Sequence, residues 1–186
     1  HGCTDDTEER VMRFGDYRVS CLKVPRRQTY PQTAENHWFA GPVAPINAAL
    51  SISSGEWIAR IDDDDTWTPD HLASLLSFAR DGNYEFVSGA HATHEGKVAP
   101  YDLAGVKVGG TQTWLYRSYL KFFRYNPDCY RKKVDRVNDT DIQDRFRRAG
   151  VRMGYLDKVV AHVLPRPGES DVGLKAYQRN SDEMAF

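Results

Sequence analysis

The sequence predicts an α/β fold with a mainly parallel sheet flanked by helices, and two observations support this class. Short apolar segments typical of strands alternate with helical segments through the middle of the chain, which is the pattern of α/β layer folds. Residues 56–61 are apolar without clean alternation, as in strands buried on both faces of a parallel sheet. Within residues 69–81, Leu72, Leu75 and Leu76 follow helical spacing and form one apolar stripe.

The remaining elements follow in chain order, with glycines and prolines at their ends. Before residue 56 we expect a helix over residues 4–15, a strand over 17–24, irregular chain over 25–41 and a helix over 43–53. After residue 81 we expect a strand over 84–89, a hairpin turn at 95–96, a strand over 111–116, a short helix over 118–123, a helix over 140–149 and strands over 151–156 and 159–164.

Composition restricts the domain organisation and the partners. The chain has 186 residues, with 25 Lys and Arg against 26 Asp and Glu. It therefore fits one domain spanning residues 1–186, without the basic excess of nucleic-acid-binding proteins. No apolar run is long enough to predict a transmembrane segment, and three widely spaced cysteines indicate free thiols. We expect no nucleic-acid partner and a cytoplasmic location, free or at the inner face of the membrane.

Four consecutive aspartates, residues 62–65, directly follow the predicted strand over 56–61. Carboxylates this close repel one another, and a divalent cation such as Mg²⁺, Mn²⁺ or Ca²⁺ is the simplest compensation. An EF-hand loop is excluded because its glycine and glutamate positions hold Trp67 and Ala73. The alternative is a solvated acidic loop in which Asp65 and Asp70 only cap the next helix. The strand end favours a ligand site, because ligands bind at the carboxyl ends of strands in such sheets.

The segment from Gly55 to Asp65, followed by Trp67 and Pro69-Asp70, resembles the metal-binding segment of family 2 glycosyltransferases. The resemblance implies a GT-A-like nucleotide-diphospho-sugar transferase fold and Mn²⁺ or Mg²⁺ as cofactor. It implies that Asp64 holds the metal, that Asp62 faces the donor ribose and adds a metal ligand, and that Asp65 supports both. Asn47 matches an asparagine of the family and is assigned to donor binding.

A second segment, Asn138-Asp139-Thr140-Asp141, resembles the acidic pair that supplies the catalytic base in the same family. The resemblance places Asp139 at the base position, whereas Asn138 replaces the usual glutamate. The alternative is that Asp139 only caps the helix. Asp141 is assigned to the acceptor side.

Two further positions are assigned by analogy. Arg166 stands where many members have histidine before Pro-Gly, and it could bind a donor phosphate. Trp114 could stack on an acceptor sugar, although a core position is an equal alternative.

The start of the chain, His1 to Asp5, resembles the end of a family motif that closes the second strand. The resemblance therefore implies a domain that lacks the first strands of the fold and is incomplete at its N-terminus. Strand 56–61 would then expose an edge, and we expect a homodimer or strand exchange across it.

Three functions are consistent with these features. The first is metal-dependent, inverting transfer of a sugar from a nucleotide-diphosphate sugar to a saccharide or lipid-linked acceptor, in cell-surface polysaccharide synthesis. The second is a catalytically inactive fragment that folds or oligomerises without turnover. The third is a sugar nucleotidylyltransferase, whose characteristic glycine-rich, arginine-bearing loop is not found in this sequence.

Overall fold

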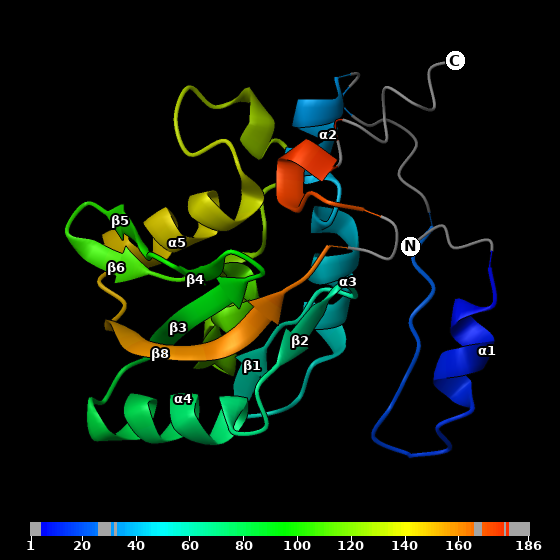
Figure 1. Cartoon of the computed structure of the whole chain (residues 1–186), viewed down its shortest axis with the longest axis horizontal. Coiled ribbons are helices and arrows are strands. Elements are labelled where there is room, and N and C mark those ends of the chain that lie inside the picture. Colours follow the sequence, from blue (N-terminus) through cyan, green and yellow to red (C-terminus); the bar gives the residue numbers. More distant parts are fainter. Residues whose placement is uncertain (1–4, 26–30, 32, 166–168, 177, 179–186) are drawn as a thin grey trace.

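The computed structural model describes residues 5–25, 31, 33–165, 169–176 and 178. These residues form a mixed α/β fold in which helices flank a curled sheet (Figure 1), so the predicted class is confirmed. The helices are α1 (Thr7–Met12), α2 (Ala34–Ala40), α3 (Val43–Ile52), α4 (His71–Asp81) and α5 (Asn138–Arg148), with 3-10 turns η1 (Thr111–Thr113), η2 (Ser118–Phe123) and η3 (Cys129–Arg131). The strands are β1 (Trp57–Ala59), β2 (Asp65–Trp67), β3 (Phe86–Thr93), β4 (Gly96–Val98), β5 (Tyr101–Leu103), β6 (Val106–Val108), β7 (Leu115–Arg117) and β8 (Met153–Val163).

The main sheet has the strand order β1-β7-β3-β8-β2, with β4 paired to β3. Only the pair β3–β8 is parallel in this sheet, so the mainly parallel sheet predicted from the sequence is wrong. Parallel pairing needs a long crossover between strands. The chain instead reaches β4 through a tight turn after β3, and it reaches β7 after the β5–β6 hairpin. Among the described strands β1 pairs with β7 alone, and it lies at one end of the order, as expected of an edge strand.

Strand β8 is one element where the sequence predicts two. The register slips twice between Gly89 and His91 of β3, first past Asp157 and Lys158 of β8 and then past Val160. Asp157 and Lys158 are exposed, whereas Val160 is buried. The polar pair therefore interrupts the apolar pattern without ending the strand.

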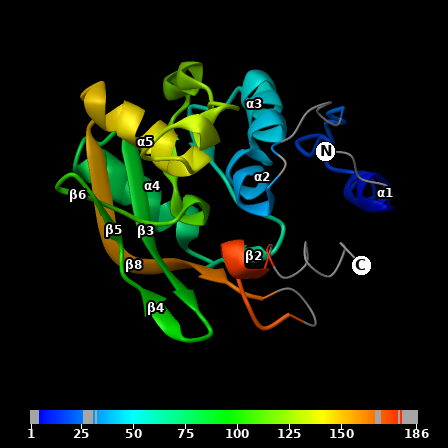
Figure 2. The same cartoon turned by 90° about the horizontal axis from the view of Figure 1, so that it is seen from above.

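The N-terminal part differs most from the prediction. Residues 17–24 form no strand, and α1 buries none of its side chains. Figures 1 and 2 show α1 and the described chain after it standing apart from the sheet, so none of the described strands lies beside them to pair. The segment predicted to be irregular contains α2, whose N-cap Thr33 accepts a hydrogen bond from the Asn36 amide at 3.3 Å.

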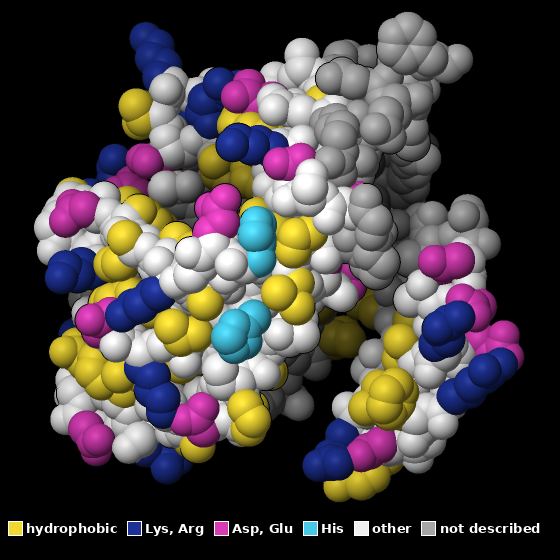
Figure 3. All heavy atoms as spheres, viewed as in Figure 1, with side chains coloured by type: hydrophobic (Ala, Val, Ile, Leu, Met, Phe, Trp, Pro, Cys, Tyr) yellow, Lys and Arg dark blue, Asp and Glu magenta, His cyan; other side chains and the backbone are white. Residues whose placement is uncertain are grey.

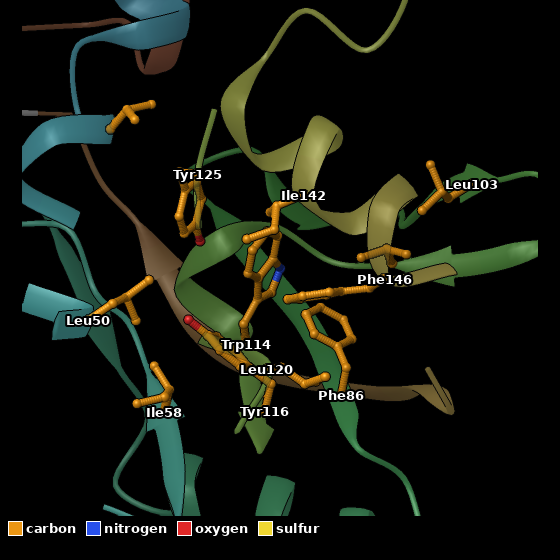
Figure 4. Packing of buried hydrophobic residues seen from close by; sticks show 12 residues of the cluster. Leu50, Ile58, Phe86, Leu103, Trp114, Tyr116, Leu120, Tyr125, Ile142 and Phe146 are labelled. Carbon is orange, nitrogen blue, oxygen red and sulfur yellow. The ribbon is translucent and has the colours of Figure 1, made fainter. Parts of the chain in front are cut away.

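An aromatic cluster forms the centre of the core (Figure 4). The Phe86 ring contacts Trp114 edge-on at 5.2 Å between centroids and lies 5.8 Å from Phe146. These residues come from β3, from the turn before β7 and from α5, so the cluster joins the helix to the sheet. Burial of large aromatic side chains in such contacts is a major stabilising contribution.

On the face shown in Figure 3, Lys and Arg side chains are interspersed with Asp and Glu, without a broad patch of either sign. In the part of the chain that the structure describes, no helix is long and apolar enough to cross a membrane.

Candidate active site

The acidic run forms the link between the two end strands of the sheet. Strand β1 ends at Ala59, the chain turns through residues 60–64, and β2 then begins at Asp65 and pairs antiparallel with β8. This short link draws the two ends of the curled sheet together. A cavity of about 500 Å³ opens beside it, and all four aspartates of residues 62–65 line it together with Arg60 and Asp139. The two segments singled out in the sequence therefore meet at one site.

Arg60 supplies positive charge at the acidic turn. The Arg60 guanidinium bonds Asp62, with Nη2 2.8 Å from Oδ1 and 3.1 Å from Oδ2 and with Nε 3.2 Å from Oδ1. Burial, and then the charges of Asp64 and Asp62, raise the pKa of Asp65 to about 7. Such a shift is expected when a carboxyl is buried beside other carboxylates.

The donor atoms of this turn suit a hard cation, since carboxylate oxygens are the ligands that Mg²⁺ and Mn²⁺ prefer. Their present arrangement is not a ready-made cage. Among the residues that the structure describes, no three His, Cys, Asp or Glu side chains are grouped closely enough to hold a metal ion. The fit therefore lies in the chemistry and charge of the aspartates, and further ligands would have to come with the bound molecule.

Asp139 lies in the first turn of α5 and faces the same cavity. Its Oδ1 accepts hydrogen bonds from the Thr140 amide at 2.7 Å and from the Thr140 hydroxyl at 3.3 Å. Burial raises the pKa of Asp139, and the hydrogen bond from Thr140 and the positive charge of Arg60 offset part of that rise. A carboxyl of raised pKa in a cavity has the properties of a general base.

The structure explains why asparagine precedes Asp139. The Asn138 side chain is 5% exposed, and its Nδ2 donates to the carbonyl oxygen of Phe39 in α2 at 2.8 Å. A glutamate carboxylate has no donor for that carbonyl. Asn138 therefore fixes the start of α5 against α2, and this contact sets where Asp139 stands.

Another wall of the cavity is formed by residues 110–112, and its position depends on the close approach of the Gly109 backbone to the Gly89 backbone. The Gly109 amide donates to the Ser88 hydroxyl at 3.0 Å, and a Cβ at Gly109 would lie 1.9 Å from the Gly89 oxygen. Only glycine fits there. The next residues, Gly110 to Gln112, line the cavity, and the Gln112 carbonyl accepts a hydrogen bond from Trp67 Nε1 at 2.8 Å.

Three predicted site residues do not line the cavity. Asn47 is held at both ends of its amide by the Tyr125 backbone, at 2.8 and 2.9 Å, so it positions Tyr125. Asp141 is 3% exposed and pairs with two cationic side chains. Trp114 is 0% exposed in the core, where its Nε1 donates to the Gly109 carbonyl at 2.9 Å. A stacked acceptor sugar cannot reach a side chain that is buried this completely. Arg166 lies outside the described residues.

Other lining residues were missed by sequence reasoning. Arg60 interrupts the apolar strand just before the acidic run, and a cation in that position was a usable signal. His91 and Thr93 reach the cavity from the end of β3, because that strand is longer than predicted. Burial lowers the pKa of His91.

Comparisons with known proteins identify a matching family and several relatives. The family Glycosyl transferase family 2 matches residues 32–148. Two Escherichia coli proteins, named as UDP-Glc:alpha-D-GlcNAc-diphosphoundecaprenol beta-1,3-glucosyltransferases WfaP and WfgD, are each 29% identical, over 75 and 86 residues. These matches cover 40% and 46% of this chain but only 25% and 29% of the relatives.

Solved structures of Staphylococcus aureus TarS share the fold. TarS 1-349 in complex with UDP-GlcNAc aligns with a TM-score of 0.60 at 18% identity, over 94% of this chain and 50% of TarS 1-349. Whole TarS aligns with a TM-score of 0.55 at 15% identity, over 98% of this chain and 35% of TarS. The fold, the acidic strand end and the family match over most of the chain lead to one conclusion: this chain belongs to glycosyltransferase family 2.

Proposed function

We propose that this domain transfers a sugar from a nucleoside-diphosphate sugar to an acceptor hydroxyl, with a divalent cation and with inversion at the anomeric carbon. One observation carries the proposal. The acidic turn at residues 62–65 and Asp139, far apart in the sequence, line one cavity. Sugar transfer requires both a place for a charged leaving group and a base for the acceptor proton.

Asp64, with Asp62 as a second ligand, would hold Mn²⁺ or Mg²⁺, and Asp65 would stand behind them. A bound cation supplies neutralisation of the charge that develops on the departing diphosphate. The raised pKa of Asp65 supports this assignment, because burial and the neighbouring carboxylates oppose its ionisation and a nearby cation would favour it. Asp62 is at the same time oriented by its bonds to Arg60.

Asp139 would take the acceptor proton. As the acceptor oxygen bonds to the anomeric carbon, the bond from that carbon to the diphosphate oxygen breaks and the hydroxyl proton moves to the Asp139 carboxylate. Burial raises the pKa of Asp139 and so strengthens its carboxylate as a base, while the nearby Arg60 charge offsets part of that rise. A single displacement of this kind inverts the anomeric centre.

The relatives point to the substrates. The two E. coli relatives carry names that state a UDP-glucose donor and a GlcNAc-diphosphoundecaprenol acceptor. We therefore propose a UDP-sugar donor, a lipid-linked saccharide acceptor, and work at the cytoplasmic face of the membrane in polysaccharide assembly. The family match favours sugar transfer over nucleotidylyl transfer.

Calorimetric titration with UDP and with GDP, each with and without Mn²⁺, tests the donor site. We expect UDP binding that requires Mn²⁺ and that disappears in Asp64→Ala. The matched control is Asp81→Ala, because Asp81 is an exposed acid at the end of α4. Absence of nucleotide binding by a folded wild type would contradict the proposal and favour a non-catalytic scaffold.

A further inference from the structure

His91 is a polar residue of the cavity to which the proposed function gives no role. It lies near the end of β3, where its backbone pairs with Val98 of β4 and with Ala161 of β8, so strands on both sides hold its position. The register with β8 slips between Ala90 and His91. Such irregularities re-aim side chains and are over-represented beside active sites. Thr93 lies two residues further along the same face of the strand and also lines the cavity.

The His91 imidazole has no partner in the part of the chain that the structure describes. No hydrogen bond or ion pair joins it to another described residue, and its nitrogens are not among the fully buried atoms that lack a partner. The side chain is half-buried and lines the cavity, so a ligand there can reach it. A half-buried ring loses hydration, and hydrogen bonds from a ligand would compensate that loss.

The protonation state of His91 indicates which part of a ligand it suits. Burial lowers the pKa of His91, and no charge of the described residues offsets this effect. The imidazole is therefore neutral at pH 7, with one nitrogen that donates and one that accepts a hydrogen bond. A neutral ring offers a diphosphate no charge to pair with, whereas it matches a sugar hydroxyl, which both donates and accepts. The chemistry of His91 therefore fits a sugar better than a phosphate.

The neighbouring turn η1 adds a second neutral side chain to the cavity. Gln112 belongs to η1, which packs against β3, and it is 6% exposed and lines the cavity. Its backbone carbonyl accepts the hydrogen bond from Trp67, while none of the described residues bonds its side-chain amide. A few polar groups placed in this way fix the orientation of a ligand in a pocket.

The charges of the site indicate which sugar His91 meets. In the proposed function the diphosphate lies at the acidic turn and the acceptor hydroxyl lies at Asp139, so the anomeric carbon lies between them. Neither Asp139 nor the aspartates of the turn contribute to the pKa of His91, so His91 stands away from both. The groups of the donor that extend away from the anomeric carbon are the remote hydroxyls of the transferred sugar.

We propose that His91 is a substrate-binding residue whose imidazole hydrogen-bonds hydroxyls of the transferred sugar that are remote from the anomeric carbon. The inference rests on the proposed function and deepens it, because it names a residue that recognises the sugar part of the donor. His91 contributes to the choice of sugar, whereas the acidic turn and its cation hold the diphosphate.

The test compares His91→Phe and His91→Gln with wild type by calorimetric titration of UDP, UDP-glucose and UDP-GlcNAc, with saturating Mn²⁺ and without acceptor. His91→Phe keeps a ring but has no nitrogen. We expect it to weaken the UDP-sugar that wild type binds more tightly by about 3- to 10-fold, the size expected for one or two neutral hydrogen bonds. His91→Gln keeps a donor and an acceptor and should weaken that binding less. UDP lacks the transferred sugar, so its affinity should be unchanged in both variants.

His162→Phe is the matched control. His162 lies opposite Ala92 on the adjacent strand β8, is exposed, and is not among the described cavity residues. Its substitution should leave the affinities for UDP and for the UDP-sugars unchanged. Thermal unfolding verifies that each variant is folded, and His91→Ala takes the place of His91→Phe if the phenyl ring prevents folding.

The outcomes separate this inference from the function beneath it. Unchanged UDP-sugar affinity in His91→Phe would overturn the role of His91 alone, even if the KM for a lipid-linked acceptor rises. Equal weakening of UDP and the UDP-sugar would also overturn it, because His91 would then act on the nucleotide or on the fold. Absence of UDP binding by wild type would remove the proposed function, and this inference with it.

Discussion

The helix α5 and the acidic turn at residues 62–65 hold carboxylates in different ways. In α5, Asp141 is bonded by Lys132 at 2.8 Å and by Arg145 at 2.9 Å. In the acidic turn, one guanidinium serves Asp62, and the pKa of Asp65 stays raised to about 7. The Asp141 carboxylate is paired with two cations of the fold, whereas burial and neighbouring carboxylates oppose the ionisation of Asp65.

This difference separates structural from functional acids better than residue type does. Sequence alone shows two acidic segments of similar appearance, at residues 62–65 and 138–141. Compensation within the fold marks Asp141 as structural, whereas the raised pKa values of Asp65 and Asp139 mark groups placed at a cost. Such a cost is typical of residues retained for function.

The largest effect is expected for Asp139→Asn, because Asp139 is the proposed catalytic base whereas Asp141 of the same helix has a structural role. Transfer should fall by about 10²- to 10⁴-fold, the usual contribution of a general base. UDP affinity with Mn²⁺ should not change. The transfer rate is measured as UDP release from UDP-glucose with a GlcNAc-diphospholipid acceptor, and the UDP affinity is measured by calorimetry. A variant that keeps wild-type turnover would remove Asp139 from the mechanism.

Asn138→Asp tests whether the hydrogen bond donated by the Asn138 side chain fixes the start of α5. The substitution removes the hydrogen bond to the Phe39 carbonyl and places a carboxylate beside that oxygen. We expect a loss of about 1–3 kcal/mol in the free energy of unfolding at pH 7. Urea denaturation gives the value. Asn126→Asp is the control. The Asn126 side-chain oxygen accepts a hydrogen bond from the Asp128 backbone amide, and an aspartate at position 126 can still accept it. Equal losses at both positions would contradict the assignment.

Asp65→Asn measures the excess charge of the turn. Because the folded-state pKa of Asp65 is raised above its value near 3.8, folding disfavours its ionisation. The resulting penalty is absent at pH 4, grows as pH rises, and is complete above pH 7. The half-buried position limits it by screening, so the variant should gain about 1 kcal/mol at pH 8 and nothing at pH 4.

Asp70→Asn gives the opposite sign and serves as the control for Asp65. Hydrogen bonds from Lys158, Thr68 and Ser74 hold the pKa of Asp70 below its usual value. Its stabilising effect is therefore present at neutral pH and is lost as pH falls through the lowered pKa. Thermal unfolding between pH 3 and pH 8 records both profiles. The same pH dependence in the two variants would contradict the account.

The smallest effect on stability is expected for Asp157→Ala. Asp157 pairs with Lys97 at 2.5 Å on the bulge of β8, where both side chains are largely exposed. Exposed pairs of this kind are screened by solvent and salt. We expect no measurable change in Tm at physiological salt, and a clear decrease would show that the bulge contributes more than its exposure suggests.

The parts of the fold that sequence predicted are those with local causes. Helices α3 and α4 lie within one or two residues of their predicted ranges. The acidic turn and Asp139 were found because a motif carries them, and the structure brings them to one cavity. The site assignments themselves stay predictions.

The errors arise where distant contacts decide the structure. Residues 17–24 alternate like a strand, but a strand needs a neighbour and the described chain supplies none there. Asn47 and Trp114 were assigned to ligands, yet their partners are the Tyr125 backbone and the core, which no local pattern reveals. The direction of strand pairing likewise depends on connections that the sequence alone leaves open.

The central claim is that the acids of the turn serve a ligand and that Asp141 serves the fold. Thermal unfolding of wild type, Asp64→Ala and Asp141→Asn, each with and without UDP and Mn²⁺, tests it most directly. We predict that Asp64→Ala keeps the Tm of the free wild type but loses the increase on ligand addition. Asp141→Asn should unfold several degrees lower and keep that increase. The reverse pattern, in which Asp64→Ala unfolds early and Asp141→Asn loses the ligand effect, would contradict the account.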